Sequence, residues 1–244
     1  MPGAPDPLYV RARRALLDAL ESLGAHRDAV ILAGAQAIYL HAGEGDLGVA
    51  PYTTDGDLAL DPSALVDDPK LEDSMRTGGF VLSVNPDLIG TWVSPDGIQI
   101  DLLVPDAVGG SGRRAARLGI HGNQGARKGR GREAVLVDKQ MMVVGALDKS
   151  DLRRIEVWVA GPAGLIVAKL HKIAERQAAP RRQDFKDALD IYRQYQPTIS
   201  PVGPGVCSKL RCPAQSLVKR SASSRSYLVR RRRPARIWLV GQLS

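Results

Sequence analysis

The stretch TTDGDLAL, residues 53–60, is the most informative part of this chain, because it combines a strand pattern with two carboxylates. Residues 57–61 predict a strand, and side chains on a strand alternate between its two faces. Asp55 and Asp57 therefore project from the same side, about 6–7 Å apart. Two carboxylates at that separation can both reach a hard cation such as Mg²⁺, which prefers oxygen ligands. An Asp-x-Asp pair also arises by chance on surface strands and turns, so its meaning depends on the segments around it.

Two neighbouring segments support a metal and phosphate site. AVILAG (29–34) predicts a short buried strand that ends at Gly34, and a helix is expected over 35–43. The free backbone N–H groups at the start of a helix favour a phosphate. IQIDLLV (98–104) places Asp101 in an apolar strand, where a buried carboxylate is costly unless it is paired or bound to a metal. The alternative for Asp101 is a position at the strand edge, where it caps a turn.

The remaining hydrophobic patterns predict an α/β (α+β) fold, a small mixed sheet flanked by helices and followed by a C-terminal helical part. Further strands are expected at 80–84 and 154–160, and a hairpin at 91–94 and 98–105. Further helices are expected over 8–24, 63–79, 161–177 and 181–195. The predicted organisation is a core over 1–160, C-terminal helices over 161–196 and a basic tail over 197–244.

The composition is that of an ordinary soluble globular protein, with 44% hydrophobic and 25% charged residues among 244. No apolar run approaches the roughly 18 residues that a membrane helix needs, and no secretory signal is recognised. The expected location is therefore the cytoplasm. Cys207 and Cys212 have no second cysteine pair or nearby histidine that would complete a zinc site, so no role is assigned to them.

The positive charge is concentrated near the C-terminus. Residues 197–244 contain 10 Lys and Arg and no acid, which leaves 24 basic and 26 acidic residues in 1–196. The tail is either a disordered basic arm or the product of a frameshift in a GC-rich gene. Segment 109–132 also lacks acids and carries seven Lys or Arg, so it is expected to be a mobile or partly helical insert. It either holds a polyanionic acceptor such as RNA or is a solvated loop.

The order of these motifs resembles the DNA polymerase β-like nucleotidyltransferases, which have a glycine turn after a strand, Asp-x-Asp on the next strand and a lone Asp on a third. Within that superfamily the chain is similar to the AbiEii and MenT group of toxin nucleotidyltransferases. The resemblance covers residues 28–195. It rests on AGAQA (33–37), TTDGDLAL (53–60), IQIDLLV (98–104), AKLHKIAER (168–176) and DFKDALDIY (184–192).

The sequence departs from this pattern at two places. The superfamily often has Gly-Ser or Gly-Gly at the turn, whereas this chain has Gly34-Ala35, and Ala35 offers no hydroxyl to a phosphate. The family also continues folded past the last helix, whereas residues 197–244 do not have the pattern of a folded segment.

The resemblance implies an enzyme that moves a nucleoside monophosphate from an NTP to an acceptor and releases pyrophosphate. The expected acceptor is the 3′ end of tRNA, and the expected biological role is the toxin of a toxin–antitoxin pair with a cognate antitoxin protein. Two alternatives stay open. In the first, the enzyme has the same chemistry but its acceptor is a small molecule or a protein side chain. In the second, the chain is an inactive relative that binds nucleic acid.

The resemblance also assigns roles to individual residues. Asp55, Asp57 and Asp101 hold two Mg²⁺ ions, with Mn²⁺ as an alternative, and Asp101 also serves as a general base. Lys169 or Lys172 contacts the triphosphate, and Asp187 or Asp190 orients Lys169 by a salt bridge, with Asp187 favoured. The residues that carry catalysis are then Asp55, Asp57, Asp101, Lys169 and Asp187. Those expected to bind the nucleotide are Gly34, Ala35, Thr54, Lys169, Lys172 and Asp190, with His171 and Arg176 as weaker candidates.

Overall fold

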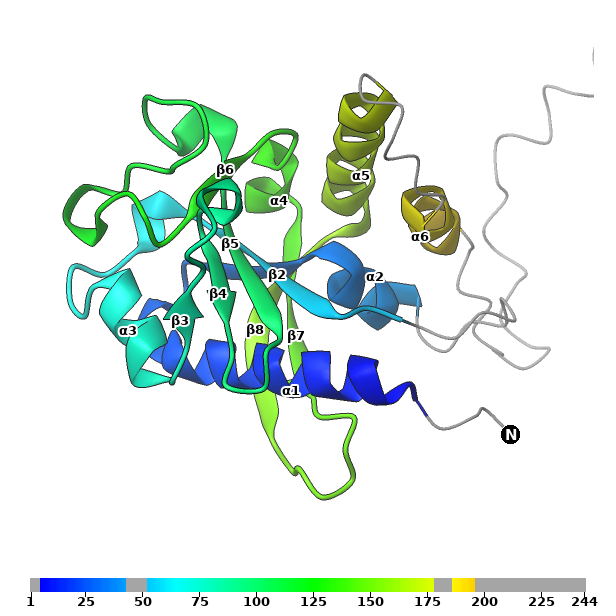
Figure 1. Ribbon diagram of the computed structural model, residues 1–244. Coiled ribbons are helices and arrows are strands. Elements are labelled where there is room, and N and C mark those ends of the chain that lie inside the picture. Colours follow the sequence, from blue (N-terminus) through cyan, green and yellow to red (C-terminus); the bar gives the residue numbers. More distant parts are fainter. Residues whose placement is uncertain (1–4, 43–51, 178–185, 196–244) are drawn as a thin grey trace, which may run out of the picture. The chain divides into compact units, whose positions relative to one another are not determined.

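The computed structural model of the chain describes residues 5–42, 52–177 and 186–195. These residues form a mixed α/β fold with six α-helices and an eight-stranded sheet, as the sequence predicts (Figure 1). The chain divides into two units, Met1–Thr198 and Ile199–Ser244, and the sheet and all six helices belong to the first. The predictions for the tail 197–244, and the two cysteines within it, lie outside the described residues.

The sheet has the order β3-β4-β5-β2-β1-β8-β7, and β6 pairs with β5. The β2/β5, β1/β8 and β5/β6 pairs are parallel, and the other pairs are antiparallel. The expected hairpin is confirmed as β4 and β5. The strands are β1 (Val30–Ala33), β2 (Asp55–Leu60), β3 (Val81–Leu82), β4 (Thr91–Val93), β5 (Gln99–Pro105), β6 (Arg127–Gly129), β7 (Lys139–Gly145) and β8 (Arg154–Ala160).

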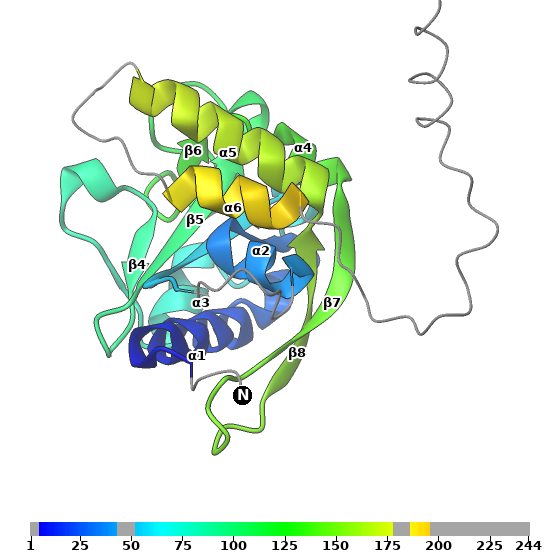
Figure 2. The same ribbon diagram turned by 90° about the vertical axis from the view of Figure 1, so that its right-hand side faces the viewer.

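The helices contact one another in series. Figure 2 shows α5, α6 and α2 one after another, and α6 contacts both α5 and α2. Helix α2 in turn contacts α1, where the Arg13 guanidinium donates to the Gln36 side-chain oxygen at 2.7 Å. None of the helices in the described ranges combines the length and the apolar character needed to cross a bilayer. Their bounds are α1 (Pro7–Ser22), α2 (Gly34–Ala42), α3 (Leu71–Thr77), α4 (Glu133–Val137), α5 (Pro162–Gln177) and α6 (Lys186–Tyr195).

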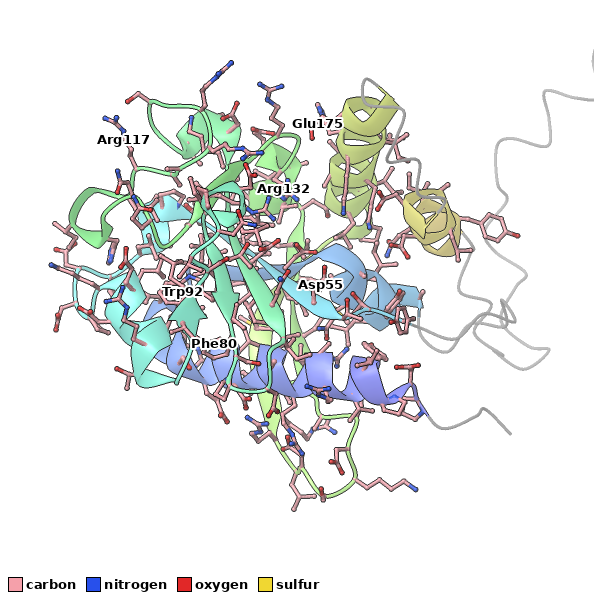
Figure 3. All side chains as sticks on the ribbon, in the orientation of Figure 1. Asp55, Phe80, Trp92, Arg117, Arg132 and Glu175 are labelled. Atoms are coloured by element: carbon pink, nitrogen blue, oxygen red, sulfur yellow. The ribbon has the colours of Figure 1, made fainter. Side chains whose placement is uncertain are left out.

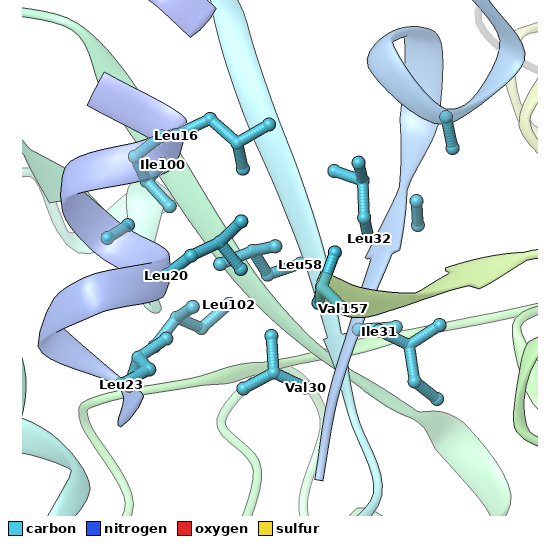
Figure 4. Close-up of a cluster of buried hydrophobic side chains, with 14 of the residues drawn as sticks. Leu16, Leu20, Leu23, Val30, Ile31, Leu32, Leu58, Ile100, Leu102 and Val157 are labelled. Carbon is cyan, nitrogen blue, oxygen red and sulfur yellow. The ribbon is translucent and has the colours of Figure 1, made fainter. Parts of the chain in front are cut away.

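The hydrophobic core between α1 and the sheet determines which face of β2 and β5 carries the polar residues. Leu16 of α1 packs with Leu58 of β2 and Ile100 of β5, and all three side chains are fully buried (Figure 4). Burial of side chains of this size contributes about 1.5–3 kcal/mol each. Because side chains alternate along a strand, Asp57 and Asp101 project from the opposite face of the sheet.

Two predicted segments differ from the structure. The helix expected over 63–79 is reduced to α3, because Pro69 interrupts the range and disfavours helix in the residue before it. Segment 109–132, expected to be a mobile or partly helical insert, has helical structure only in the short 3-10 helix Gly119–His121. It contains β6, which adds to β5, and it is tied to the sheet by Trp92, whose indole N–H donates to the Gly125 carbonyl at 2.9 Å.

Candidate functional site

The pairing of β2 with β5 brings the predicted carboxylates together. In the parallel register of these strands, Asp57 lies directly opposite Asp101, and Asp55 lies opposite Gln99. On its other edge β2 pairs with β1, where Asp57 lies opposite Ala33, the residue before Gly34. Three segments that are separated in sequence therefore meet at Asp57, and Asp55 shares its strand face.

Gly34 forms the turn between β1 and α2, and the carboxylate of Asp57 lies against it. Gly34 has φ of +66°, a left-handed conformation that L side chains rarely adopt. A Cβ added at this position would overlap the Asp57 carboxyl group. Only glycine satisfies both conditions, so Gly34 is required for the position of Asp57. Ala35 follows in the first turn of α2 and is buried.

The three carboxylates differ in their partners. Asp55 accepts a hydrogen bond from the Thr53 hydroxyl at 2.5 Å. Asp101 accepts one from the Thr91 hydroxyl at 2.5 Å and forms an ion pair with Arg127. The side chain of Asp57 makes no hydrogen bond or ion pair with a residue that the structure describes. Its carboxylate is therefore the one that is available to a ligand.

The electrostatics of Asp101 show that the carboxylates repel one another. Burial raises the pKa of Asp101 above its ordinary value, and the negative charge of Asp57 raises it further. Arg127 and the Thr91 hydroxyl act in the opposite direction. A cation placed between Asp57 and Asp101 would relieve this repulsion, because like charges at short range each disfavour the ionised form of the other.

These residues have the right donors for a hard cation, but their side chains are not gathered into a complete ligand set. Among the described residues, no group of three or more His, Cys, Asp or Glu side chains is placed to hold a metal ion. The reason lies in the partners of the side chains, since Asp101 is directed to Arg127 and Asp55 to Thr53. Carboxylate oxygens are the ligands that Mg²⁺ prefers, and Asp57 and Asp101 already face each other. Binding would require Asp101 to exchange Arg127 for the ion.

Helices α5 and α6 are joined by a buried ion cluster around Lys169. The Lys169 ammonium contacts both Asp187 and Asp190 at 2.8 Å, and Lys172 lies 3.9 Å from Asp187. Both predicted partners of Lys169 thus bind it, whereas the sequence favoured Asp187 over Asp190. Burial alone lowers the pKa of Lys169, but the two carboxylates outweigh this effect and raise it. Lys169 is therefore charged and firmly held.

A pocket lies between the two lysines of this cluster and Asp57 on the sheet. Asp57 and the Gly34 turn form one side, and α4 and α5 form the other. Arg132, which immediately precedes α4, also faces the pocket, and Figure 3 shows it next to α4 and α5. Its lining residues are Ala33, Gly34, Asp57, Arg132, Val135, Leu165, Ala168, Lys169 and Lys172.

Arg127 and Arg132 were not singled out as site residues by the sequence. They belong to the glycine-rich basic segment 109–132, in which no periodic pattern distinguishes one arginine from another. The other predicted residues are less central. Thr54 is exposed just before β2, and His171 is exposed with its ring over Gly131. The side chain of Arg176 lies outside the described residues.

Comparison of the chain with models of protein families, with curated proteins and with solved structures finds no match. What the chain does is therefore inferred from the site itself. The site combines opposed carboxylates, a glycine turn at a helix start and cationic side chains across a pocket. This combination suits a ligand that carries phosphates together with a divalent cation.

Proposed function

We propose that the chain is a Mg²⁺-dependent nucleotidyltransferase, which moves a nucleoside monophosphate from an NTP to an acceptor hydroxyl. The observation that carries the proposal is the pair Asp57 and Asp101, two carboxylates directly opposite each other on neighbouring strands. Asp57 lines a pocket that Arg132 and Lys172 also line. Phosphoryl-type transfer is catalysed mainly by positioning the reactants and neutralising charge, and these are the properties that such a pocket supplies.

The residues of the chain divide into three roles. Asp55, Asp57 and Asp101 would hold the Mg²⁺ ions, which supply positive charge to the triphosphate and to the departing pyrophosphate. The acceptor oxygen attacks the α-phosphorus, the bond from that phosphorus to the bridging oxygen breaks, and pyrophosphate leaves. Asp101 is the proposed base that receives the proton of the acceptor hydroxyl. The Gly34 turn offers backbone N–H groups to the phosphates.

The proposed acceptor is RNA, in particular the 3′ end of tRNA. Support comes from Arg113, Arg117 and Arg130, which are exposed on the same segment that carries Arg127 and Arg132. Such side chains neutralise nucleic-acid phosphates. The resemblance to the AbiEii and MenT toxins extends the proposal to a cytoplasmic toxin that stops translation by modifying tRNA and is restrained by an antitoxin protein.

The proposal is tested by incubating the full chain with each α-labelled NTP, Mg²⁺ and total RNA, and in parallel with a protein extract and a small-molecule extract. We expect the label to enter RNA of tRNA size and to disappear when Mg²⁺ is chelated. Label in protein or in small molecules instead would support the same chemistry with another acceptor. An absence of label in all fractions would contradict the nucleotidyltransferase assignment.

A further inference from the structure

The cationic side chains of the pocket differ in how much of their charge is already neutralised. Lys169 contacts two carboxylates at 2.8 Å, so its own positive charge is already neutralised. Lys172 lies at the edge of the same cluster, 3.9 Å from Asp187. Lys169 therefore joins α5 to α6 and has little positive charge to offer a ligand.

Arg132 is in the opposite situation. The only hydrogen bond of its guanidinium with a described residue is a long one, 3.5 Å, to the Arg130 carbonyl, and no described carboxylate lies within ion-pair distance of it. A guanidinium has five N–H donors, and leaving most of them unpaired in a half-buried position is unfavourable. Arg132 thus has both charge and donors available, and it faces the pocket beside Asp57.

The structure also fixes where Arg132 can reach. Its side chain lies over Gly129, where a Cβ would overlap the guanidinium, and Gly129 ends β6 on the sheet. Burial lowers the pKa of Arg132, while the charges of Asp57, Asp101 and Glu175 oppose that effect. The same carboxylates would repel a phosphate, so anion binding at Arg132 is expected to strengthen when Mg²⁺ is present.

We propose that Arg132, assisted by Lys172, is the polyphosphate-binding residue of the site and grips the β- and γ-phosphates of the incoming NTP. This inference rests on the proposed function for the identity of the ligand. The planar fork of an arginine matches the oxygens of a phosphate group and binds them through two parallel hydrogen bonds. Lys169 is then a positioning residue that holds α5 where Lys172 can reach the same ligand.

The inference is tested by calorimetric titration of the full chain with inorganic tripolyphosphate and with NTP, each with Mg²⁺. Arg132→Gln is compared with Arg154→Gln, which removes an exposed arginine of β8 that does not line the pocket. We expect Arg132→Gln to lose about tenfold or more in affinity for both ligands, as for a lost charge-assisted hydrogen bond. The control variant should stay within about twofold of the wild type. Arg132→Lys keeps the charge but loses the fork, so it should fall between the two, and it decides the question if Arg132→Gln does not fold.

The outcomes separate this inference from the proposed function. Tripolyphosphate binding that depends on Arg132, without any nucleotide transfer by the wild type, would support the subsite and contradict the enzyme assignment. Nucleotide transfer by the wild type, with unchanged ligand affinity in Arg132→Gln, would overturn the subsite alone. A wild-type chain that binds neither ligand would overturn both.

Discussion

Replacing Gly34 by alanine gives a sharp test of how the site is built. The φ of +66° costs an L residue about 1–2 kcal/mol. The added Cβ would in addition overlap the Asp57 carboxyl group, and overpacking of this kind costs about 1–3 kcal/mol. We therefore expect Gly34→Ala to lower the free energy of unfolding by about 2–5 kcal/mol and to displace Asp57.

Gly97 provides a matched control. It lies in the turn between β4 and β5 with φ of +78°, and a Cβ there would meet no atom within 4 Å. Gly97→Ala should therefore show the conformational cost alone, about 1–2 kcal/mol, which lowers Tm by about 2–8 °C. Thermal unfolding by circular dichroism measures both variants, and the nucleotide-labelling assay measures transfer.

Activity should separate the two variants more strongly than stability does. A displacement of about 1 Å in a reacting group can reduce the rate about a hundredfold, so Gly34→Ala should lose transfer while Gly97→Ala retains it. If the two variants unfold at the same temperature and transfer nucleotide at the same rate, the close contact between Gly34 and Asp57 has no functional role.

Three further predictions concern the charged groups. Lys169→Met leaves two buried carboxylates without their lysine and should lower the free energy of unfolding in urea by about 3–5 kcal/mol, whereas a loss below about 1 kcal/mol would contradict a buried cluster. Burial lowers the pKa of His26, and the charge of the His121 ring lowers it further. The unfolded chain therefore binds more protons at His26 than the folded chain, and the free energy of unfolding should fall as pH drops below about 6.5. His26→Leu should flatten that pH profile, and an unchanged slope would refute the cause. Arg127→Ala removes the counter-ion of Asp101, so millimolar Mg²⁺ should raise the Tm of this variant more than that of the wild type. An equal or smaller rise would contradict a cation site at Asp57 and Asp101.

Much of the site could be predicted from local sequence patterns. The alternation in TTDGDLAL and the apolar run around Asp101 indicated strands, and the structure confirms β2 and β5. The position of Asp57 directly opposite Asp101 could not be derived in the same way, because it depends on a parallel pairing between two strands that are far apart in the chain. A buried Asp101 was expected to need a partner, and that partner is Arg127, which the sequence did not identify.

The arginines of segment 109–132 show where sequence reasoning fails. Many glycines and no acids are typical of a solvated loop, and a three-residue strand such as β6 leaves no periodic signal. The order of the segment comes from long-range contacts. Gly90 is one of them, since its left-handed backbone lets the Ala126–Arg127 backbone approach so closely that a Cβ would overlap it. Arg127 and Arg132 reach the site only through this packing.

The most direct test of the central claim is Mg²⁺-dependent pyrophosphate release from NTP with RNA as acceptor, in wild type, Asp57→Asn and Asp96→Asn. Asp96 is exposed in the turn before β5, so its variant controls for the loss of one carboxylate. Because Asp57 has no bonded partner among the described residues and repels Asp101, Asp57→Asn should fold with unchanged or higher Tm. We expect Asp57→Asn to release no pyrophosphate, while wild type and Asp96→Asn release one for each nucleotide joined. Release by Asp57→Asn at the wild-type rate would contradict the assignment of Asp57 as a metal ligand.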